Sequence, residues 1–192
     1  MPEKNQAALD FLLSRRSRMS RTLVAPYPDR AQMEVLLTAA ARTPDHGKLV
    51  PWRFIVLEGA ALERLADLVE MRGAELEVDP AKVEKLRSAF ADAGRIVAVI
   101  EVPKESAGVP HIEQSYAVGA ACLGLVNAAL AAGWGAQWLS GWASHDAEFT
   151  RRGLGLAEHE RVAGFIHIGT ESKVPSERPR PDLAEITEWV TD

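Results

Sequence analysis

The chain has 192 residues, of which 47% are hydrophobic and 26% are charged, a composition typical of a globular protein with one core. Its 27 acidic against 22 basic side chains give a formal net charge of −5, which argues against broad nucleic-acid binding, because that binding requires a basic face. The single cysteine, Cys122, excludes an internal disulfide, and its apolar surroundings predict a core residue rather than a nucleophile.

Hydrophobic patterning predicts helices and strands in an order without strict alternation. Apolar residues at helical spacing predict helices over 5–16, 28–44, 61–75, 80–91, 109–133 and 145–154. Runs rich in β-branched and aromatic residues predict strands over 53–59, 95–103, 136–142 and 161–170. The polar tail 171–192 holds three prolines in seven residues and is expected to run extended. This order favours an α+β fold over a doubly wound parallel sheet.

One stretch, Tyr116–Trp134, carries no charge and nearly reaches membrane-spanning length. It is mostly Ala and Gly, contains Asn127 and stands alone in the chain, so we interpret it as a buried helix and expect no membrane contact. Its small residues recur at about one-turn spacing, which lets another helix approach closely. Two alternatives stay open from this pattern: the core helix of a monomer, or a helix buried between two subunits.

Common catalytic motifs are absent from the sequence. It contains no G-x-S-x-G, C-x-x-C, H-E-x-x-H, phosphate loop or G-x-G-x-x-G, so it lacks the usual signs of a hydrolase, a kinase or a Rossmann dehydrogenase. We therefore predict no catalytic side chain and no metal site. The opening MPEKNQAALDFLL lacks the basic start and long apolar core of a signal peptide, and we expect a cytoplasmic protein.

Three stretches carry groups suited to ligand binding. Arg15–Ser17 combines two guanidinium forks with a hydroxyl, which suits a phosphate monoester, although a solvated helix end has the same composition. Thr43–Phe54 leaves a helix, passes His46 and Lys48, and enters a strand through a Pro-Trp pair. Gly135–Trp142 brings two tryptophans and a serine to the end of a strand.

In this order the three stretches resemble the FMN-dependent nitroreductase family. The motifs on which this resemblance rests are "RRS" after the first helix, "A-x-x-P-D-H…PW-x-F", and a small-residue helix followed by "G…W-x-S-G". The chain looks most like the short YdjA-like branch of NAD(P)H nitroreductases, and its "FIHIGT" strand and "RPRP" tail match as well. The resemblance implies a mostly antiparallel central sheet flanked by helices, in an intertwined homodimer with FMN at the interface. It also implies one domain over 1–192, with the arm 171–192 extending over the partner.

The resemblance implies where the FMN phosphate lies. Arg15, Arg16 and Ser17 match the residues that hold the phosphate and ribityl chain in this family. Arg178 and Arg180, in the tail, stand where many relatives place basic residues near the same phosphate. The bound phosphate would then explain why an acidic chain gathers arginines near its start.

The resemblance also implies contacts to the flavin ring. Arg42 and His46 match flavin-contacting positions of the YdjA-like group. Trp138, Leu139 and Ser140 match its second flavin-contacting stretch, partly through backbone groups.

Three positions depart from the family pattern. Met19 replaces the last arginine of R-R-S-x-R, Val50 replaces the glutamine of N-x-Q-P-W, and Leu139 replaces the arginine of W-R-S. A cation near flavin N1 would then come from one of four other residues, namely Arg42, Lys48, Arg18 or Arg21.

The resemblance implies an FMN-dependent oxidoreductase that passes hydride from NAD(P)H to nitroaromatic, quinone or similar acceptors. Because flavin itself carries the redox step, such an enzyme needs no protein acid or base. Its partners would be a second copy of the chain and a small-molecule acceptor. Two alternatives remain: a non-catalytic flavin-binding or storage dimer, and a same-fold enzyme acting on flavin, halogenated, enone or aldehyde substrates.

Overall fold

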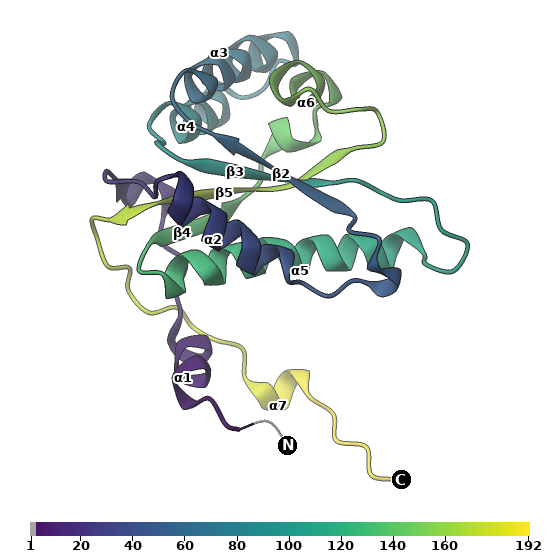
Figure 1. Cartoon of the computed structure of the whole chain (residues 1–192). Coiled ribbons are helices and arrows are strands. Elements are labelled where there is room, and N and C mark those ends of the chain that lie inside the picture. The colour runs from purple at the N-terminus through teal and green to yellow at the C-terminus, as the bar shows by residue number, and fades with distance from the viewer. Residues whose placement is uncertain (1–2) are drawn as a thin grey trace.

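The computed structural model describes residues 3–192 and arranges most of them in three layers, with a sheet between two groups of helices (Figure 1). The α-helices are α1 (Gln6–Ser14), α2 (Arg30–Ala41), α3 (Ala60–Glu75), α4 (Pro80–Ala91), α5 (His111–Ala131), α6 (Ala147–Leu154) and α7 (Leu183–Ile186). The strands are β1 (Leu23–Val24), β2 (Trp52–Leu57), β3 (Ile96–Glu101), β4 (Gly135–Leu139) and β5 (Arg161–Glu171). Three short 3-10 helices complete the order: η1 (Ser20–Thr22), η2 (His46–Lys48) and η3 (Trp142–His145).

Every recorded strand pair in the sheet is antiparallel. The order is β1-β5-β3-β2, and β4 also pairs with β5, so the long β5 is the strand on which the sheet is built. In the β4–β5 register Gln137 lies opposite His167, and Trp138 lies opposite Ile166. The prediction of an α+β fold with a mostly antiparallel sheet flanked by helices is confirmed.

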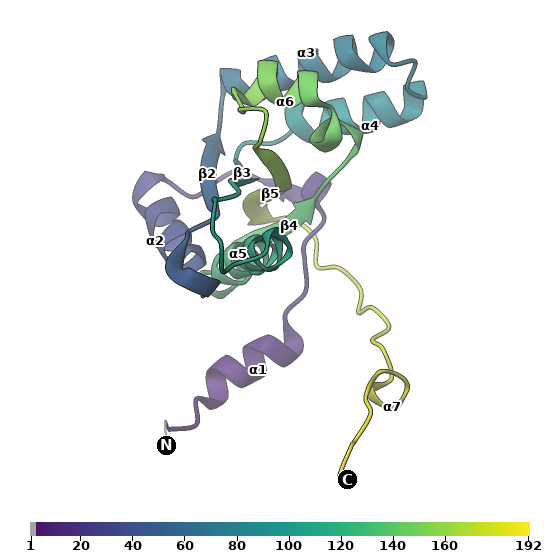
Figure 2. The same ribbon diagram turned by 90° about the vertical axis from the view of Figure 1, so that its right-hand side faces the viewer.

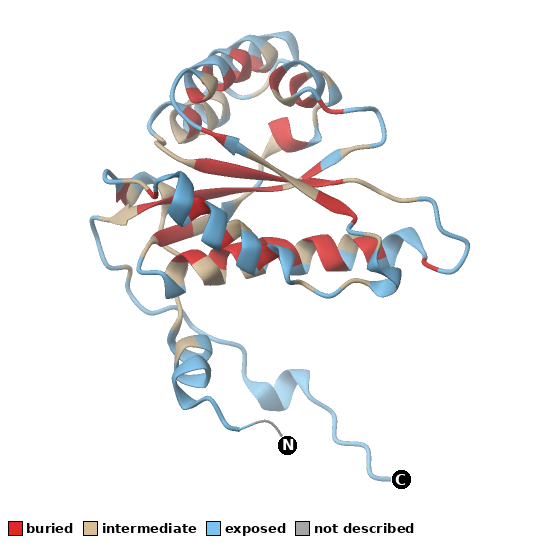
Figure 3. Ribbon diagram, viewed as in Figure 1, coloured by how far each residue is buried: buried red, intermediate tan, exposed pale blue. Residues whose placement is uncertain are grey.

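The two faces of the sheet carry separate apolar clusters (Figure 3). One face packs on α2 and α5 through residues such as Leu36, Leu125 and Ile166. The other packs on α3, α4 and α6 through residues such as Leu65, Phe90 and Phe149. The strand β3 contributes to both clusters and is buried along its whole length, as its unbroken apolar sequence predicts.

The long apolar helix α5 lies along one face of the sheet. By length and composition it is long enough to cross a membrane, but 44% of its most apolar window is buried inside the molecule. Cys122 is fully buried there, and desolvation raises the pKa of its thiol to about 12, which confirms the predicted core role. Ile112, Tyr116 and Leu123 on the same helix are exposed.

The two ends of the chain extend away from the three layers (Figure 2). None of the residues of α1 is buried, and Leu12 and Leu13 are exposed. In the tail 171–192 the short helix α7 interrupts the extended course that the prolines predict, because Asp182 caps it by accepting a hydrogen bond from the Ala184 N–H. Trp189, beyond α7, is also exposed.

Asp146 links α3 to α6, two of the helices that cover one face of the sheet, and its contribution to stability can be tested by substitution. It caps α6 by accepting from the Phe149 N–H at 3.0 Å, and it pairs with both Nε and Nη2 of Arg72 at 2.8 and 3.0 Å. Asp146→Ala should lower the free energy of unfolding by about 2 kcal/mol, because a cap and a charged hydrogen bond are lost together. Asp146→Asn keeps an acceptor for the cap and should cost about half as much. Urea denaturation at neutral pH measures both values.

The same pair predicts a pH dependence. The hydrogen bonds from Arg72 hold the pKa of Asp146 below its ordinary value of 3.8. Its contribution to stability is therefore complete above that value and is lost as the pH falls through the lower pKa of the folded state. The stability gap between wild type and Asp146→Ala should narrow in acid, and a gap that stayed constant between neutral pH and pH 3 would contradict this assignment.

Candidate functional site

The arginine-rich segment follows α1 and lies against the start of β4. The helix ends at Ser14, and Arg15 already has extended backbone angles, φ −57° and ψ 140°. The Arg18 N–H donates to the Ala136 carbonyl at 2.8 Å. A Cβ at Gly135 would lie 3.3 Å from the Arg18 Cβ and 2.5 Å from Leu23, so a glycine is needed where this segment crosses the strand.

Two more contacts fix the segment beyond Ser17. Arg18 forms an ion pair with Glu171 at the end of β5, with Nε and Oε2 at 3.0 Å. The Ser20 N–H donates to Oε1 of Gln137 on β4 at 2.6 Å. These contacts hold the arginine-rich segment against β4 and β5, the two strands beside the candidate site.

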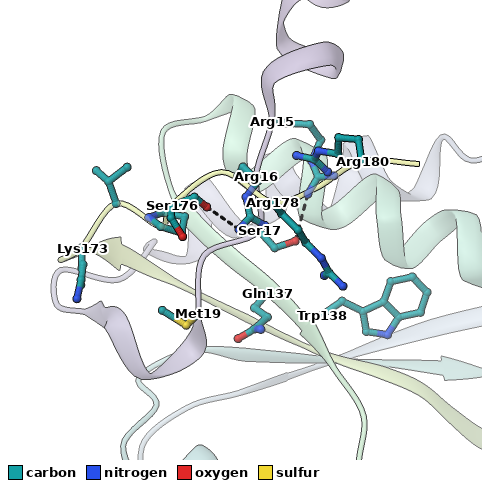
Figure 4. Close-up of a pocket in the computed structure, with 12 residues that line it drawn as sticks. Arg15, Arg16, Ser17, Met19, Gln137, Trp138, Lys173, Ser176, Arg178 and Arg180 are labelled. Atoms are coloured by element: carbon teal, nitrogen blue, oxygen red, sulfur yellow. Dashed lines mark hydrogen bonds between the residues drawn. The ribbon is translucent and has the colours of Figure 1, made fainter. Parts of the chain in front are cut away.

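The tail passes beside the same segment (Figure 4). Nη2 of Arg16 donates to the Ser176 carbonyl at 2.9 Å. The Glu177 carboxylate accepts from Nη2 of Arg180 at 3.0 Å and lies 3.9 Å from Nε of Arg16. The contact between Arg16 and Ser176 joins residues that are 160 positions apart in the sequence.

Together these elements surround a pocket of about 940 Å³, here called the arginine pocket. Five of its residues are basic and none is acidic, in a chain whose net charge is −5. The residues that line it are Arg15, Arg16, Ser17, Met19, Gln137, Trp138, Lys173, Val174, Pro175, Ser176, Arg178 and Arg180. The predicted tail arginines therefore meet the predicted N-terminal arginines around one space.

The charges in this pocket are not balanced within the chain. Burial lowers the pKa of Arg15, and repulsion from Arg180 and Arg16 lowers it further. The Nε atoms of Arg15 and Arg16 are buried and have no hydrogen-bond partner in the part of the chain that is described. Nη2 of Arg15 donates to Oγ of Ser17 at 3.2 Å, which directs both side chains to one place. The donor set suits an anion with several oxygen atoms.

Trp138 forms an aromatic wall of the arginine pocket. Its Nε1 donates to the Ala163 carbonyl at 3.2 Å, and its ring lies over Gly164, where an added Cβ would be 2.0 Å from Nε1. The side chain is 40% exposed, so one part of a large apolar surface remains available to a ligand.

A second pocket, of about 480 Å³, adjoins the first and is here called the α4 pocket. Met19 and Gln137 line both pockets, so they form the boundary between them. The other lining residues come from η1 and its neighbours, α4, β4 and β5: Ser20, Arg21, Lys85, Ser88, Ala89, Asp92, Ala93, Leu139 and His167.

The predicted site residues divide into those at the two pockets and those elsewhere. Six line the arginine pocket, and Leu139 lines the α4 pocket. Arg42 follows α2, His46 begins η2, and Ser140 follows β4, and none of the three lines either pocket in the single chain. Nδ1 of His46 lies 2.7 Å from Oε2 of Glu113. Their contacts to a flavin ring stay predictions.

Sequence reasoning missed several lining residues. Gln137 precedes the predicted stretch by one position, and its alternation with Leu139 along a strand is the signal that places both on one side. Lys173 lies at the start of the tail without any motif around it. Lys85 and His167 belong to a charged helix and an apolar strand, and only the fold brings them to one pocket.

Comparison with known proteins assigns the chain to a family. Residues 12–170 match the model of the Nitroreductase family. The chain is 34% identical over 163 residues to the Escherichia coli (strain K12) protein named "Putative NAD(P)H nitroreductase YdjA", a match that covers 85% of this chain and 87% of the relative. It is 36% identical over 165 residues to a similarly named Haemophilus influenzae protein, covering 85% and 88%.

Solved structures share the fold at lower identity. A nitroreductase-like family protein from Bacillus cereus has a TM-score of 0.79 at 24% identity, covering 99% of this chain and 98% of that one. The FMN and NADPH-dependent nitroreductase NfnB from Sphigopyxis sp. strain HMH has a TM-score of 0.75 at 19% identity, covering 96% and 99%. On the family match and the two curated relatives, the chain belongs to the Nitroreductase family of oxidoreductase enzymes.

Proposed function

We propose that this protein binds FMN with its phosphate in the arginine pocket, and that it passes hydride from NAD(P)H to electron-poor acceptors such as nitroaromatics or quinones. The observation that carries the proposal is the unbalanced charge of the pocket. Five basic side chains fit a phosphate dianion, as do two buried guanidinium nitrogens that have no hydrogen-bond partner among residues 3–192; the neighbouring α4 pocket offers room for a flat ring. The curated relatives are named NAD(P)H nitroreductases, which supports the choice of reductant.

The residues of the site would bind and orient the cofactor. FMN, when bound, supplies the chemistry by accepting two electrons and a proton as hydride at N5 and releasing them to an acceptor. Arg15, Arg16 and Ser17 would hold the phosphate, with Arg178 and Arg180 closing over it from the tail. Trp138 would cover apolar surface and keep water from one side of the ligand.

We further propose that the working unit is a cytoplasmic homodimer with FMN at the interface. Apolar residues are exposed on α1, α5 and the tail, as expected for surfaces that a second copy covers. Both α1 and the tail also extend away from the sheet (Figure 2). Arg42 and His46 line neither pocket of their own chain, and the partner would contribute them to the flavin ring. The arm 171–192 would then lie over the partner.

Anaerobic reduction tests the proposed activity. The purified protein with added FMN should be yellow, and a stoichiometric amount of NADH or NADPH should bleach the visible flavin absorbance in the absence of oxygen. A nitroaromatic or quinone added afterwards should restore the colour. Failure to bind FMN would overturn the proposal, whereas FMN binding without bleaching by either nicotinamide would identify a flavin-storing protein.

Arg16→Ala tests the phosphate position. Loss of a charge-assisted contact to phosphate should weaken FMN binding by about 2 kcal/mol, which is about thirtyfold in Kd. Arg30→Ala is the matched control, because Arg30 is an exposed arginine on α2 whose one recorded ion pair within residues 3–192 is with Glu34. Titration of each apoprotein with FMN, followed by flavin fluorescence, gives both constants. Equal affinity in the two variants would remove Arg16 from the site.

Leu13→Glu tests the role of α1 in dimer formation. Leu13 is 76% exposed in the single chain, so the substitution should leave the fold intact and yet weaken a dimer that buries this side chain at least tenfold, because an unpaired carboxylate is costly to bury. Leu76→Glu, at the end of α3 on the other side of the sheet from α5, is the control. Sedimentation equilibrium should give twice the 20.9 kDa chain mass for wild type. A strictly monomeric wild type would contradict the dimer.

A further inference from the structure

The α4 pocket continues the arginine pocket past Met19 and Gln137, and the two differ in chemistry. The arginine pocket is crowded with cations, whereas the α4 pocket is mainly apolar and carries Arg21, Lys85 and Asp92 as its charged groups. FMN has the same division, with an anionic phosphate at one end and a flat, mostly apolar ring at the other. A phosphate held by the arginines would therefore direct the ring along Gln137 toward the α4 pocket.

His167 lines the α4 pocket from the strand β5 and supplies no positive charge to it. The side chain is 4% exposed and has no recorded hydrogen-bond partner among residues 3–192. Desolvation lowers its pKa to about 4, so the imidazole is neutral at pH 7. Any positive charge in this pocket must therefore come from other groups.

The four cations that the family resemblance left as candidates are not equally well placed to stabilise negative charge in the α4 pocket. Arg18 is occupied by its ion pair with Glu171 and lines neither pocket. Arg42 and Lys48 line neither pocket of their own chain either. Arg21 does line the α4 pocket, where its recorded side-chain contact is the sulfur of Met19 at 3.7 Å.

Lys85 is a cation that the sequence did not indicate. It projects from α4 into the same pocket as Arg21, and no ion pair is recorded for it in the described chain. Asp92, the residue that caps the C-terminal end of α4, is the one carboxylate of the described pocket lining. The pocket therefore combines two basic groups with one acidic group, and it carries a net positive charge beside the boundary residue Met19.

We propose that Lys85 and Arg21 supply the positive charge that stabilises the flavin ring after it takes up hydride. The inference rests on the proposed function. Hydride transfer moves two electrons and one proton from NAD(P)H to flavin N5, the nicotinamide leaves as NAD(P)⁺, and the ring gains one negative charge that is centred on its N1 side. Cations near N1 favour that charge without a proton from the protein. In this chain they come from η1 and α4 rather than from position 19, where Met19 is uncharged.

Redox potentials of the FMN-loaded protein test this assignment. Lys85→Gln and Arg21→Gln should leave the Kd for oxidised FMN within about threefold of wild type, because the phosphate contacts are untouched. Each should weaken binding of reduced FMN about tenfold relative to oxidised FMN, which lowers the two-electron midpoint potential by about 30 mV. Lys85→Arg keeps the charge and should keep the wild-type potential. Lys82→Gln, an exposed lysine on the same helix that does not line the pocket, is the matched control.

The outcomes separate this inference from the proposed function. Wild-type potentials in both Lys85→Gln and Arg21→Gln, with normal binding of oxidised FMN, would overturn the assignment of these cations and leave the FMN site intact. An equal shift in the Lys82→Gln control would also overturn it, since the effect would then be one of overall charge. A wild-type protein that binds no FMN would overturn the proposed function, and this inference with it.

Discussion

The candidate site depends on one electrostatic constraint: the fold holds arginine side chains of like charge close together around one pocket. The lowered pKa of Arg15 reflects the unfavourable free energy of holding these charges together, because burial and the neighbouring guanidinium groups both disfavour its charged form. Within the described chain Glu177 is the recorded carboxylate partner of Arg16 and Arg180, and it is exposed. An anion bound among these groups would relieve the repulsion, so ligand binding and local stability are coupled at this point.

The rest of the structure keeps these charges in place. The β4 and β5 strands provide a rigid support, since Ala136 and Gln137 accept hydrogen bonds from the arginine-rich segment and Glu171 pairs with Arg18. The tail meets the arginine-rich segment through Arg16, which donates to the Ser176 carbonyl and lies 3.9 Å from the exposed Glu177 carboxylate. The N-terminal arginines thus belong to a segment bonded to two strands, whereas Arg178 and Arg180 lie in a part of the tail that has no strand pairing.

The sequence predicted the long helices and strands of the fold better than the short ones. The six long helices and four long strands are found within about two residues of most predicted bounds at either end, because hydrophobic periodicity is a local signal. The strand β1 was missed, since a two-residue strand exists only through its pairing with β5. The helix α7 was missed because the prolines before it indicate an extended chain and Asp182 alone signals the cap.

The site was predictable where residues form a motif and unpredictable where the fold assembles it. Arg15, Arg16 and Ser17 stand together in the sequence, and the resemblance to a known family linked them to Arg178 and Arg180, which the structure brings to the same pocket. Lys85 and His167 carry no such signal. Lys85 is one charged residue among many on α4, and His167 interrupts an apolar strand, so their common pocket depends on how α4 packs over β4 and β5.

The position of α1 connects the site to oligomeric state. A helix of nine residues that buries none of its side chains is marginally stable in water, yet α1 runs directly into Arg15. Contacts that fix α1 therefore also fix the first arginine of the pocket. In the proposed dimer a second copy provides those contacts through the exposed leucines of α1, and it also brings the partner's flavin-facing residues. FMN binding and dimer formation would then strengthen one another by the same free energy, because each orders the segment that the other requires.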